Sequence, residues 1–361
     1  MKLQRIRLST NQFSWLVLDN KYLPIKPIQQ FLKYQNNIEH SPNTLRAYAN
    51  HLKLYWEYLE HINKAWTEVT INDFAGFVGW LRTNNQRIVY LQEQTSCRTE
   101  STINTILTAV SVFYEFHKQM NNTDITLTTL STVRHCSYKP FLHHLNKNQS
   151  LLIKKKLIKL KIRKLLPKIL TKEQITTVIA SCNSLRDQFL ISLLYESGMR
   201  IGQALGLRHT DIKSWDNEII IQPRNDNING ARCKTKISYI VHISPKLMSL
   251  YAEYVLKECG EHTKDYVFIQ TKTKDPGKPL NYIAIRDLFL QISKKVGFTV
   301  NPHMFRHTHA TELIRDGWDC SKIQKRLGHA NIQTTLDIYS HLDTQDLKEA
   351  FMSYQLKKEK E

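Results

Sequence analysis

The C-terminal half of the chain carries side chains whose types, taken together, could transfer a phosphoryl group. The set comprises Arg200, Lys234, His303, Arg306, His329 and Tyr339. Arginine stays charged and offers paired donors to phosphate oxygens, while histidine and lysine can move protons and tyrosine can act as a nucleophile. Each residue alone has an ordinary structural explanation, since tyrosine most often fills a core and a terminal arginine or lysine is usually solvated. It is therefore their joint occurrence that indicates chemistry.

Cutting a DNA strand without metal or water needs four functions, and this set can supply them all. A nucleophile, for which Tyr339 is the candidate, attacks the phosphorus while cations stabilise charge on the non-bridging oxygens. A base helps to deprotonate the nucleophile, and an acid protonates the leaving 5′ oxygen. A phosphotyrosyl ester keeps the energy of the broken bond, so that the strand can be rejoined without ATP.

The spacing within HMFRHTHAT bears on the roles of its histidines. On a helix, His303 and Arg306 are three residues apart and project from one face, whereas His307 is expected to point elsewhere, into the structure. His303 and His307 have the spacing of paired zinc ligands, but no glutamate fills the HExxH position and no acidic cluster lies nearby in the sequence. We therefore expect no metal ion and no other cofactor.

The charge of the chain predicts a polyanionic partner. Its 361 residues include 51 Lys and Arg against 32 Asp and Glu, a formal net charge of +19, which favours nucleic acid over membrane. The segment 153–168 has eight basic residues and no acidic one, and we expect its lysines to face a phosphate backbone. Scattered single cysteines, the lack of a secretion signal and the lack of a membrane-spanning apolar run predict a cytoplasmic protein.

Apolar periodicity divides the chain into four predicted parts. Residues 1–22 alternate like a β-hairpin, 23–135 have the periodicity of an α-helical domain, 136–168 form a basic linker, and 169–361 form a second, mostly helical domain. In the first domain, Ser41 is the expected N-cap of a helix with Pro42 in its first position. Further helices are expected from about Thr70 and over 99–120.

The second domain is expected to open with a capping box formed by Thr171 and Gln174. Two strands within 217–225 and 234–244 are expected to pair around the turn-rich DNINGARC. Helices are predicted within 245–258, 280–296 and 302–352. The fold class is therefore mainly α, with a small antiparallel sheet in the second domain.

In this order, the six candidate residues resemble the signature of the tyrosine recombinase (phage integrase) family. SGMRIGQALGLRHTDI is similar to the first family box, and HMFRHTHATELIRDGWDCSKIQKRLGHANIQTTLDIYSH to the second. SPNTLRAYANHLKLYWEYL resembles the start of the N-terminal core-binding domain, and the length resembles that of some bacterial transposases. The resemblance implies a two-domain C-shaped clamp, in which a SAM-like helical domain and a mixed α/β catalytic domain grip double-stranded DNA.

The resemblance also implies a role for each matching position. Arg200 and Arg306 would clamp the scissile phosphate, His303 would assist proton transfer, His329 would hydrogen-bond the phosphate, Tyr339 would be the nucleophile and Lys234 the general acid. Lys234 is chosen over the flanking Arg232 and Lys236 because it lies eight residues before His242. Three residues after the first arginine the family usually carries an acidic residue, and here Gln203 departs from that pattern.

The function implied is that of a site-specific DNA recombinase that integrates or excises a mobile element through a 3′-phosphotyrosyl intermediate. Family members usually act as homotetramers on two paired sites, with or without accessory recombination proteins. Two alternatives stay open: a type IB topoisomerase, which relaxes DNA by similar chemistry, and a DNA-binding protein that has lost catalysis.

Overall fold

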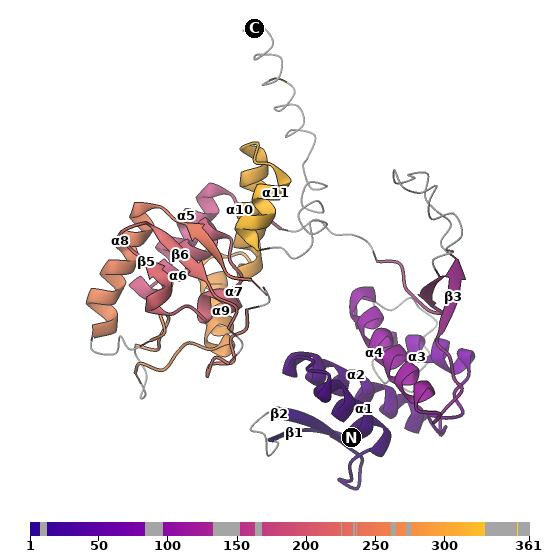
Figure 1. Cartoon of the computed structure of the whole chain (residues 1–361). Helices are drawn as coiled ribbons and strands as arrows, with labels where there is room; N and C mark the ends of the chain where they lie inside the picture. Colours follow the sequence, from indigo (N-terminus) through magenta and orange to yellow (C-terminus); the bar gives the residue numbers. More distant parts are fainter. Residues whose placement is uncertain are drawn as a thin grey trace. The chain divides into compact units, whose positions relative to one another are not determined.

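A computed structural model of the chain describes most of its length. The described residues are 1–7, 13–83, 97–132, 152–162, 168–224, 226–233, 235, 237–260, 265–271, 276–328 and 352. The chain divides into two compact units, Met1–Lys164 and Leu165–Glu361, drawn in Figure 1. The division of the sequence into four parts stays a prediction. No helix in the described ranges is long and apolar enough to cross a membrane.

The N-terminal unit begins with the predicted hairpin, continues as helices and ends with a second hairpin. Its elements are β1 (Lys2–Arg7), β2 (Phe13–Leu18), α1 (Lys26–Asn37), α2 (Pro42–His61), α3 (Ile71–Thr83), α4 (Glu100–Gln119), β3 (Thr128–Thr132) and β4 (Leu152–Lys156). Strands β1 and β2 are antiparallel, with Lys2 opposite Leu18, which confirms the first hairpin. The Ser41 hydroxyl accepts the Thr44 N–H at 3.2 Å, as expected of an N-cap.

The core of the N-terminal unit is rich in aromatic side chains, many of them from helices α2 and α4. Tyr55 and Tyr114 are both buried, and their hydroxyl oxygens are 2.7 Å apart. Tyr114 also donates to the Trp66 carbonyl at 2.7 Å, so that the buried hydroxyls are paired. Strands β3 and β4 pair antiparallel, with Thr128 opposite Lys156. The start of the basic segment 153–168, which was expected to be part of a linker, therefore lies in a strand.

The C-terminal unit is helical around a small antiparallel sheet (Figure 1). Its elements are α5 (Lys172–Ala180), α6 (Leu185–Ser197), α7 (Ile201–Leu205), the 3-10 turn η1 (His209–Asp211), β5 (Ile212–Lys213), β6 (Glu218–Ile221), β7 (Tyr239–His242), α8 (Pro245–Tyr254), the π turn η2 (Val255–Cys259), α9 (Tyr282–Val296), α10 (Pro302–Arg315) and α11 (Cys320–Leu327). The sheet order is β5-β6-β7. The predicted pairing of β6 with β7 is confirmed, with Ile219 opposite Val241.

Local signals explain most of these elements. The capping box of Thr171 and Gln174 is confirmed at the start of α5. Strand β5 was not predicted, because two residues are too few to show alternation. Two helices occupy the described part of 302–352, and the chain leaves α10 through Gly317, whose φ of 76° is unfavourable for other residues.

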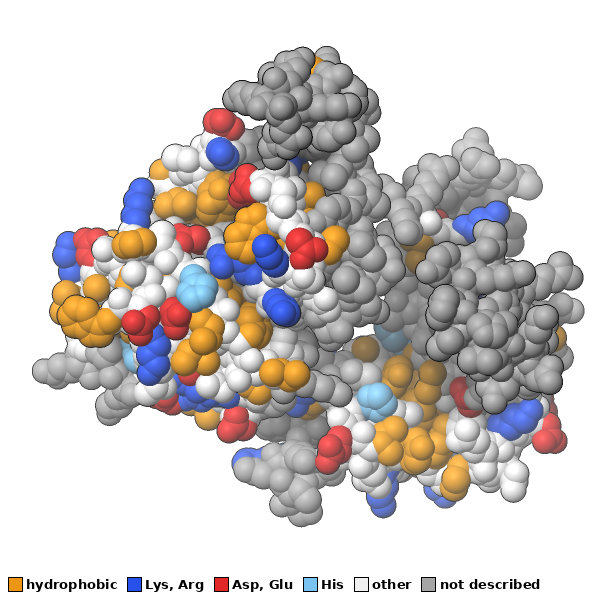
Figure 2. Space-filling view, turned by 45° about the horizontal axis from the view of Figure 1, so that its top comes forward, with side chains coloured by type: hydrophobic (Ala, Val, Ile, Leu, Met, Phe, Trp, Pro, Cys, Tyr) orange, Lys and Arg blue, Asp and Glu red, His pale blue; other side chains and the backbone are white. Residues whose placement is uncertain are grey.

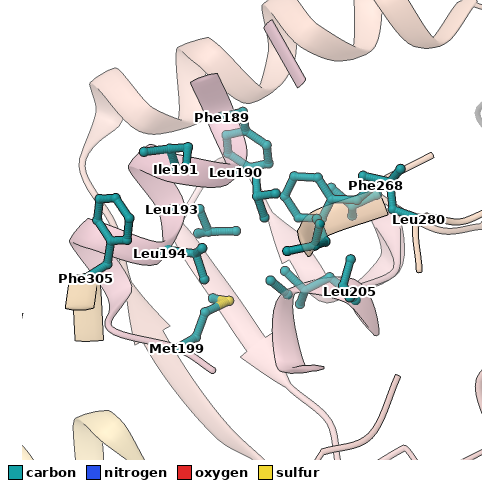
Figure 3. Packing of buried hydrophobic residues seen from close by; sticks show 14 of the residues in the cluster. Phe189, Leu190, Ile191, Leu193, Leu194, Met199, Leu205, Phe268, Leu280 and Phe305 are labelled. Carbon is teal, nitrogen blue, oxygen red and sulfur yellow. The ribbon is translucent and has the colours of Figure 1, made fainter. Parts of the chain in front are cut away.

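Helix α6 passes through the hydrophobic core and packs against both α8 and α10. Phe189, Leu190, Leu193 and Leu194 of α6 are fully buried, and Figure 3 shows them beside Phe268 and Phe305. An α-helix that is apolar on several faces is typical of the centre of a domain. The end of α6 is therefore held firmly, and it is from this end that the chain enters the candidate site.

Candidate active site

The site begins where α6 ends, at a glycine whose replacement by any other residue would displace neighbouring side chains. Gly198 has a φ of 63°, the left-handed conformation of a helix C-cap. A Cβ at this position would lie 2.6 Å from Leu327 Cδ2 and 2.7 Å from His309 Cδ2. The glycine thus allows α6, α10 and α11 to approach closely, and it sets the backbone direction two residues before Arg200.

Arg306 lies on α10 and is buried, with 5% of its surface exposed. Its Nη1 donates to the Gly198 carbonyl at 2.7 Å, and its Nη2 donates to the Leu327 carbonyl at 2.8 Å. Arg200 is half-buried, and its Nη1 donates to the next carbonyl, that of Gly328, at 3.4 Å. Consecutive carbonyls at the end of α11 therefore bring the two arginines together from separate parts of the chain.

The arginine pair concentrates positive charge at the end of α11. In the described ranges neither guanidinium forms an ion pair with a carboxylate. Burial, and secondarily the charge of Arg200, lower the pKa of Arg306 to about 9, so the side chain remains a cation at neutral pH. A buried unpaired cation is unfavourable, and an anion with several oxygens would relieve it. Figure 2 shows lysine and arginine side chains close together near the middle of this unit's visible face.

Gln203, the residue that departs from the family pattern, follows Arg200 by three residues and is buried. Its Oε1 accepts the backbone N–H of Arg200 at 2.8 Å, and its Nε2 donates to the Tyr239 hydroxyl at 3.0 Å. The same nitrogen is 3.7 Å from the sulfur of Cys233, the neighbour of Lys234. Gln203 thus contacts the backbone of Arg200, the residue before Lys234 and strand β7.

Lys234 itself lies outside the described residues, but the chain leading to it is firmly anchored. Asn227 donates to the Ala231 carbonyl at 2.9 Å, and Asn229 donates to the Leu205 and Leu280 carbonyls at 3.0 and 2.7 Å. The Arg232 carbonyl lies only 2.5 Å from where a Cβ on Gly202 would be. The stretch before Lys234 therefore packs against α7 through side-chain amides that a turn-rich composition alone does not specify.

His303 lies on the first turn of α10, exposed, one helical turn from Arg306. Its ring stacks on that of His307, with centroids 5.7 Å apart and planes inclined by 29°. Residues four apart on a helix share a face, and the Nδ1 of His307 is buried, consistent with the expectation that this ring points into the structure. Among the described residues no group of three or more His, Cys, Asp or Glu side chains is arranged to hold a metal ion.

Arg326 and His309 support the site and were not singled out as candidates from the sequence. Arg326 Nε donates to His309 Nε2 at 3.1 Å, and its Nη2 donates to the carbonyls of Glu196 and His242 at 3.0 and 3.1 Å. Burial, with the charges of Arg326 and Arg306, lowers the pKa of His309 to about 3, so its ring is neutral and can accept. One arginine thereby ties the end of α11 to α6, α10 and β7.

The structure thus describes three of the six predicted site residues and brings Arg200 and Arg306 together. His329 and Tyr339 lie outside the described residues, although His329 directly follows Gly328. The carbonyls of Leu327 and Gly328 and the side chain of Tyr239 were missed by sequence reasoning. A signal existed for Gly328 in the motif LGH, but backbone carbonyls have no residue-type signature.

Comparisons with known proteins identify relatives of both parts of the chain. Residues 168–346 match the phage integrase family, and residues 28–121 match its N-terminal SAM-like domain. The chain is 40% identical over 362 residues to transposase A from transposon Tn554 of Staphylococcus aureus, covering 99% of both. It is 23% identical over 342 residues to the tyrosine recombinase XerC of Staphylococcus aureus, covering 91% of this chain and 95% of XerC.

Solved structures share the fold at low identity. The integrase of transposon Tn1549, in complex with circular intermediate DNA, superposes with a TM-score of 0.61 at 15% identity and covers 90% of this chain and 98% of the integrase. The XerH recombinase, in a post-cleavage complex with its difH substrate, gives a TM-score of 0.60 at 19% identity and covers 91% of this chain and 84% of XerH. These similarities show the mainly helical fold with its small sheet.

Proposed function

Because the chain belongs to the phage integrase family, we propose that it cuts and rejoins double-stranded DNA through a covalent bond between Tyr339 and a 3′ phosphate. It is a tyrosine-type site-specific DNA recombinase of a mobile element. The observation that carries the proposed chemistry is the arginine pair, which is fixed on the Leu327 and Gly328 carbonyls and forms no ion pair with any carboxylate that the structure describes. Two adjacent guanidinium groups suit one phosphate that must gain charge in the transition state.

In the proposed reaction the Tyr339 oxygen attacks the phosphorus and loses its proton to a base, a role given to His303. The bond between phosphorus and the 5′ oxygen breaks, and Lys234 supplies the proton that makes this oxygen a free hydroxyl. Arg200 and Arg306 hold the non-bridging oxygens, and His329 donates a further hydrogen bond to them. The reverse attack by a 5′ hydroxyl of another strand releases Tyr339 and joins the new partner.

The proposed reaction uses neither ATP nor a resident metal ion. The phosphotyrosyl ester keeps the energy of the original phosphodiester, so that rejoining requires no external energy source. The cationic residues supply the charge that a metal would supply in a two-metal nuclease. We assign the general-acid role to Lys234 and keep Arg232, Lys236 and His303 as the alternatives to be tested.

The proposed assembly is a homotetramer on two paired DNA sites, with or without accessory recombination proteins, acting in the cytoplasm. Relatives of the same fold have been crystallised with DNA, among them a dimer of λ integrase bound to a core site. The proposed domains are 1–22, 23–135, the basic linker 136–168 and the catalytic domain 169–361, arranged as a clamp around the duplex. Lysines of the basic segment 153–168 would neutralise phosphates along this path.

Covalent trapping on a nicked suicide substrate tests the proposed function, because the nick lets the cleaved 5′ fragment diffuse away. The expected result is a DNA adduct of the full chain, with the attached peptide containing Tyr339. Complete absence of an adduct on any cognate end would favour a DNA-binding protein without catalysis. Two differently marked sites then separate the enzyme classes, since a recombinase yields hybrid products and a topoisomerase only relaxes its substrate.

A further inference from the structure

We propose that Gln203 and Tyr239 are a positioning pair, which fixes the Leu327 and Gly328 carbonyls on which the two arginines are oriented. The pair lies behind the phosphate site and acts through the arginines without touching DNA. This inference rests on the proposed function, since it names what holds the arginine clamp of that reaction. Gln203 stands where the family usually carries an acidic residue, so the proposed support of the two arginines is uncharged.

The connection runs through three hydrogen bonds. Gln203 Nε2 donates to the Tyr239 hydroxyl at 3.0 Å, and that hydroxyl donates to the Leu327 carbonyl at 3.5 Å. The Leu327 carbonyl accepts from Arg306 at 2.8 Å as well, and a carbonyl oxygen has lone pairs for both donors. Tyr239 therefore acts on the acceptor that orients Arg306.

The ring of Tyr239 lies close to the residue that carries the second carbonyl. A Cβ added to Gly328 would lie 2.7 Å from ring atoms of Tyr239 and 2.8 Å from its oxygen. Gly328 has a φ of 60°, so it ends α11 in the left-handed conformation directly above the ring. Since the Gly328 carbonyl accepts from Arg200, the tyrosine lies against the turn that orients both arginines.

An amide at position 203 determines the direction of these hydrogen bonds. Its oxygen already accepts the Arg200 N–H at 2.8 Å, so the nitrogen faces Tyr239 and donates to it. The tyrosine hydrogen is then available for Leu327. Burial raises the pKa of Tyr239, which keeps that hydrogen in place. A carboxylate at 203 would instead accept from Tyr239 and would add a negative charge beside the clamp.

The test compares Tyr239→Phe with Tyr251→Phe, a matched control in the same unit. Tyr251 also makes one side-chain hydrogen bond through its hydroxyl, to His209 at 2.7 Å. We expect Tyr239→Phe to slow single-turnover cleavage of the suicide substrate about 10-fold at saturating protein, the effect of about one hydrogen bond. Its Kd for DNA should change less than about threefold, and Tyr251→Phe should cleave within about twofold of the wild type.

A double-mutant cycle then asks whether the two residues act as a unit. Gln203→Ala combined with Tyr239→Phe should be no slower than the slower single variant, since each removes the same connection. The inference would be overturned if the effects of the two substitutions on the cleavage rate multiplied, or if Tyr239→Phe cleaved at the wild-type rate. It would also be overturned if both Tyr239→Phe and Tyr251→Phe slowed cleavage in proportion to their loss of melting temperature. Wild-type protein without any adduct would instead indicate failure of the proposed function itself.

Discussion

Arg306 donates through one guanidinium nitrogen to Gly198 and through the other to Leu327, at 2.7 and 2.8 Å. The relationship of Arg306 to Leu327 is the more informative, because Leu327 ends α11 two residues before His329. Arg306, for which we propose phosphate binding, and the chain that leads to His329 therefore share one fixed point.

Arg306→Lys should retain positive charge but lose the clamp. A lysine ammonium is a compact donor and cannot span the Gly198 and Leu327 carbonyls as the planar guanidinium does. We expect cleavage to slow by about 100-fold or more, comparable to the loss of a transition-state donor. Single-turnover trapping measures the cleavage rate. Arg286→Lys, at an exposed position of α9, is the charge-preserving control. Equal rates for the two variants would refute the clamp.

Tyr339→Phe should abolish the covalent adduct and leave DNA binding within about twofold, because it removes one hydroxyl while keeping the ring. Gel-shift titration and adduct trapping on the same substrate separate the two properties. Tyr34→Phe, in the N-terminal unit, is the matched control and should trap DNA normally. A covalent adduct formed by Tyr339→Phe would mean that another side chain is the nucleophile.

Lys234→Ala should slow cleavage of an ordinary phosphodiester by roughly 10² to 10⁴, as expected for the loss of a general acid. Replacing the 5′-bridging oxygen by sulfur, which leaves without a proton, should restore most of the rate. Lys213→Ala on β5 is the control and should behave like the wild type on both substrates. If Lys234→Ala is equally slow on both, Arg232, Lys236 and His303 become the candidates.

Chelation of divalent metal should leave cleavage unchanged within about twofold, because the charge on the phosphate is met by arginines. The measurement is adduct yield against time in EDTA and in magnesium, at matched ionic strength. Matching matters because DNA binding itself depends on salt. Loss of activity in EDTA with recovery in magnesium would point to a metal-dependent nuclease.

His309 should make the folded state sensitive to acid. Its folded pKa is lowered to about 3, below the usual value in an unfolded chain of about 6.5. The unfolded chain therefore binds the proton first, and stability present above about pH 6.5 falls by up to about 1.4 kcal/mol per pH unit as pH drops toward 3. Denaturant unfolding at pH 7 and pH 5 should show a smaller loss in His309→Gln than in the wild type.

His209, which contacts Tyr251, supplies the control for this acid effect. His209→Gln changes a histidine whose pKa is lowered less, mainly by burial. If His309→Gln and His209→Gln reduce the acid sensitivity equally, the acid sensitivity does not arise from the strongly lowered pKa of His309. A larger reduction in His309→Gln is the expected outcome.

Local signals account for the elements that the sequence predicted well. The caps at Ser41 and Thr171 were predictable because a cap is made within four residues. The pairing of β6 with β7, though not its register, was predicted from two segments rich in isoleucine and valine on either side of a turn-rich stretch. Strand β5 and the β3–β4 pairing were missed, since short or lysine-rich strands lack the apolar pattern of a typical strand.

The candidate site was less predictable than the fold, for a physical reason. Resemblance to a family named Arg200 and Arg306, but what joins them is a pair of backbone carbonyls at Leu327 and Gly328. Any residue type could carry such carbonyls, so composition and spacing give no sign of them. Tyr239 reads as an ordinary strand residue until its hydroxyl is seen between Gln203 and Leu327.

The arginine pair, which has no counter-ion among the described residues, also bears on how the free protein behaves in solution. Two cations held side by side repel each other, and any small oxyanion that enters between them binds the native state alone. Binding of that kind raises the melting temperature by mass action. Sulfate or phosphate should therefore protect the C-terminal unit against heat more than chloride at equal ionic strength. Under the proposed roles, an anion that stabilises the DNA-free protein in this way would occupy the place of the scissile phosphate, so that the buffer anion would act as a competitor of DNA.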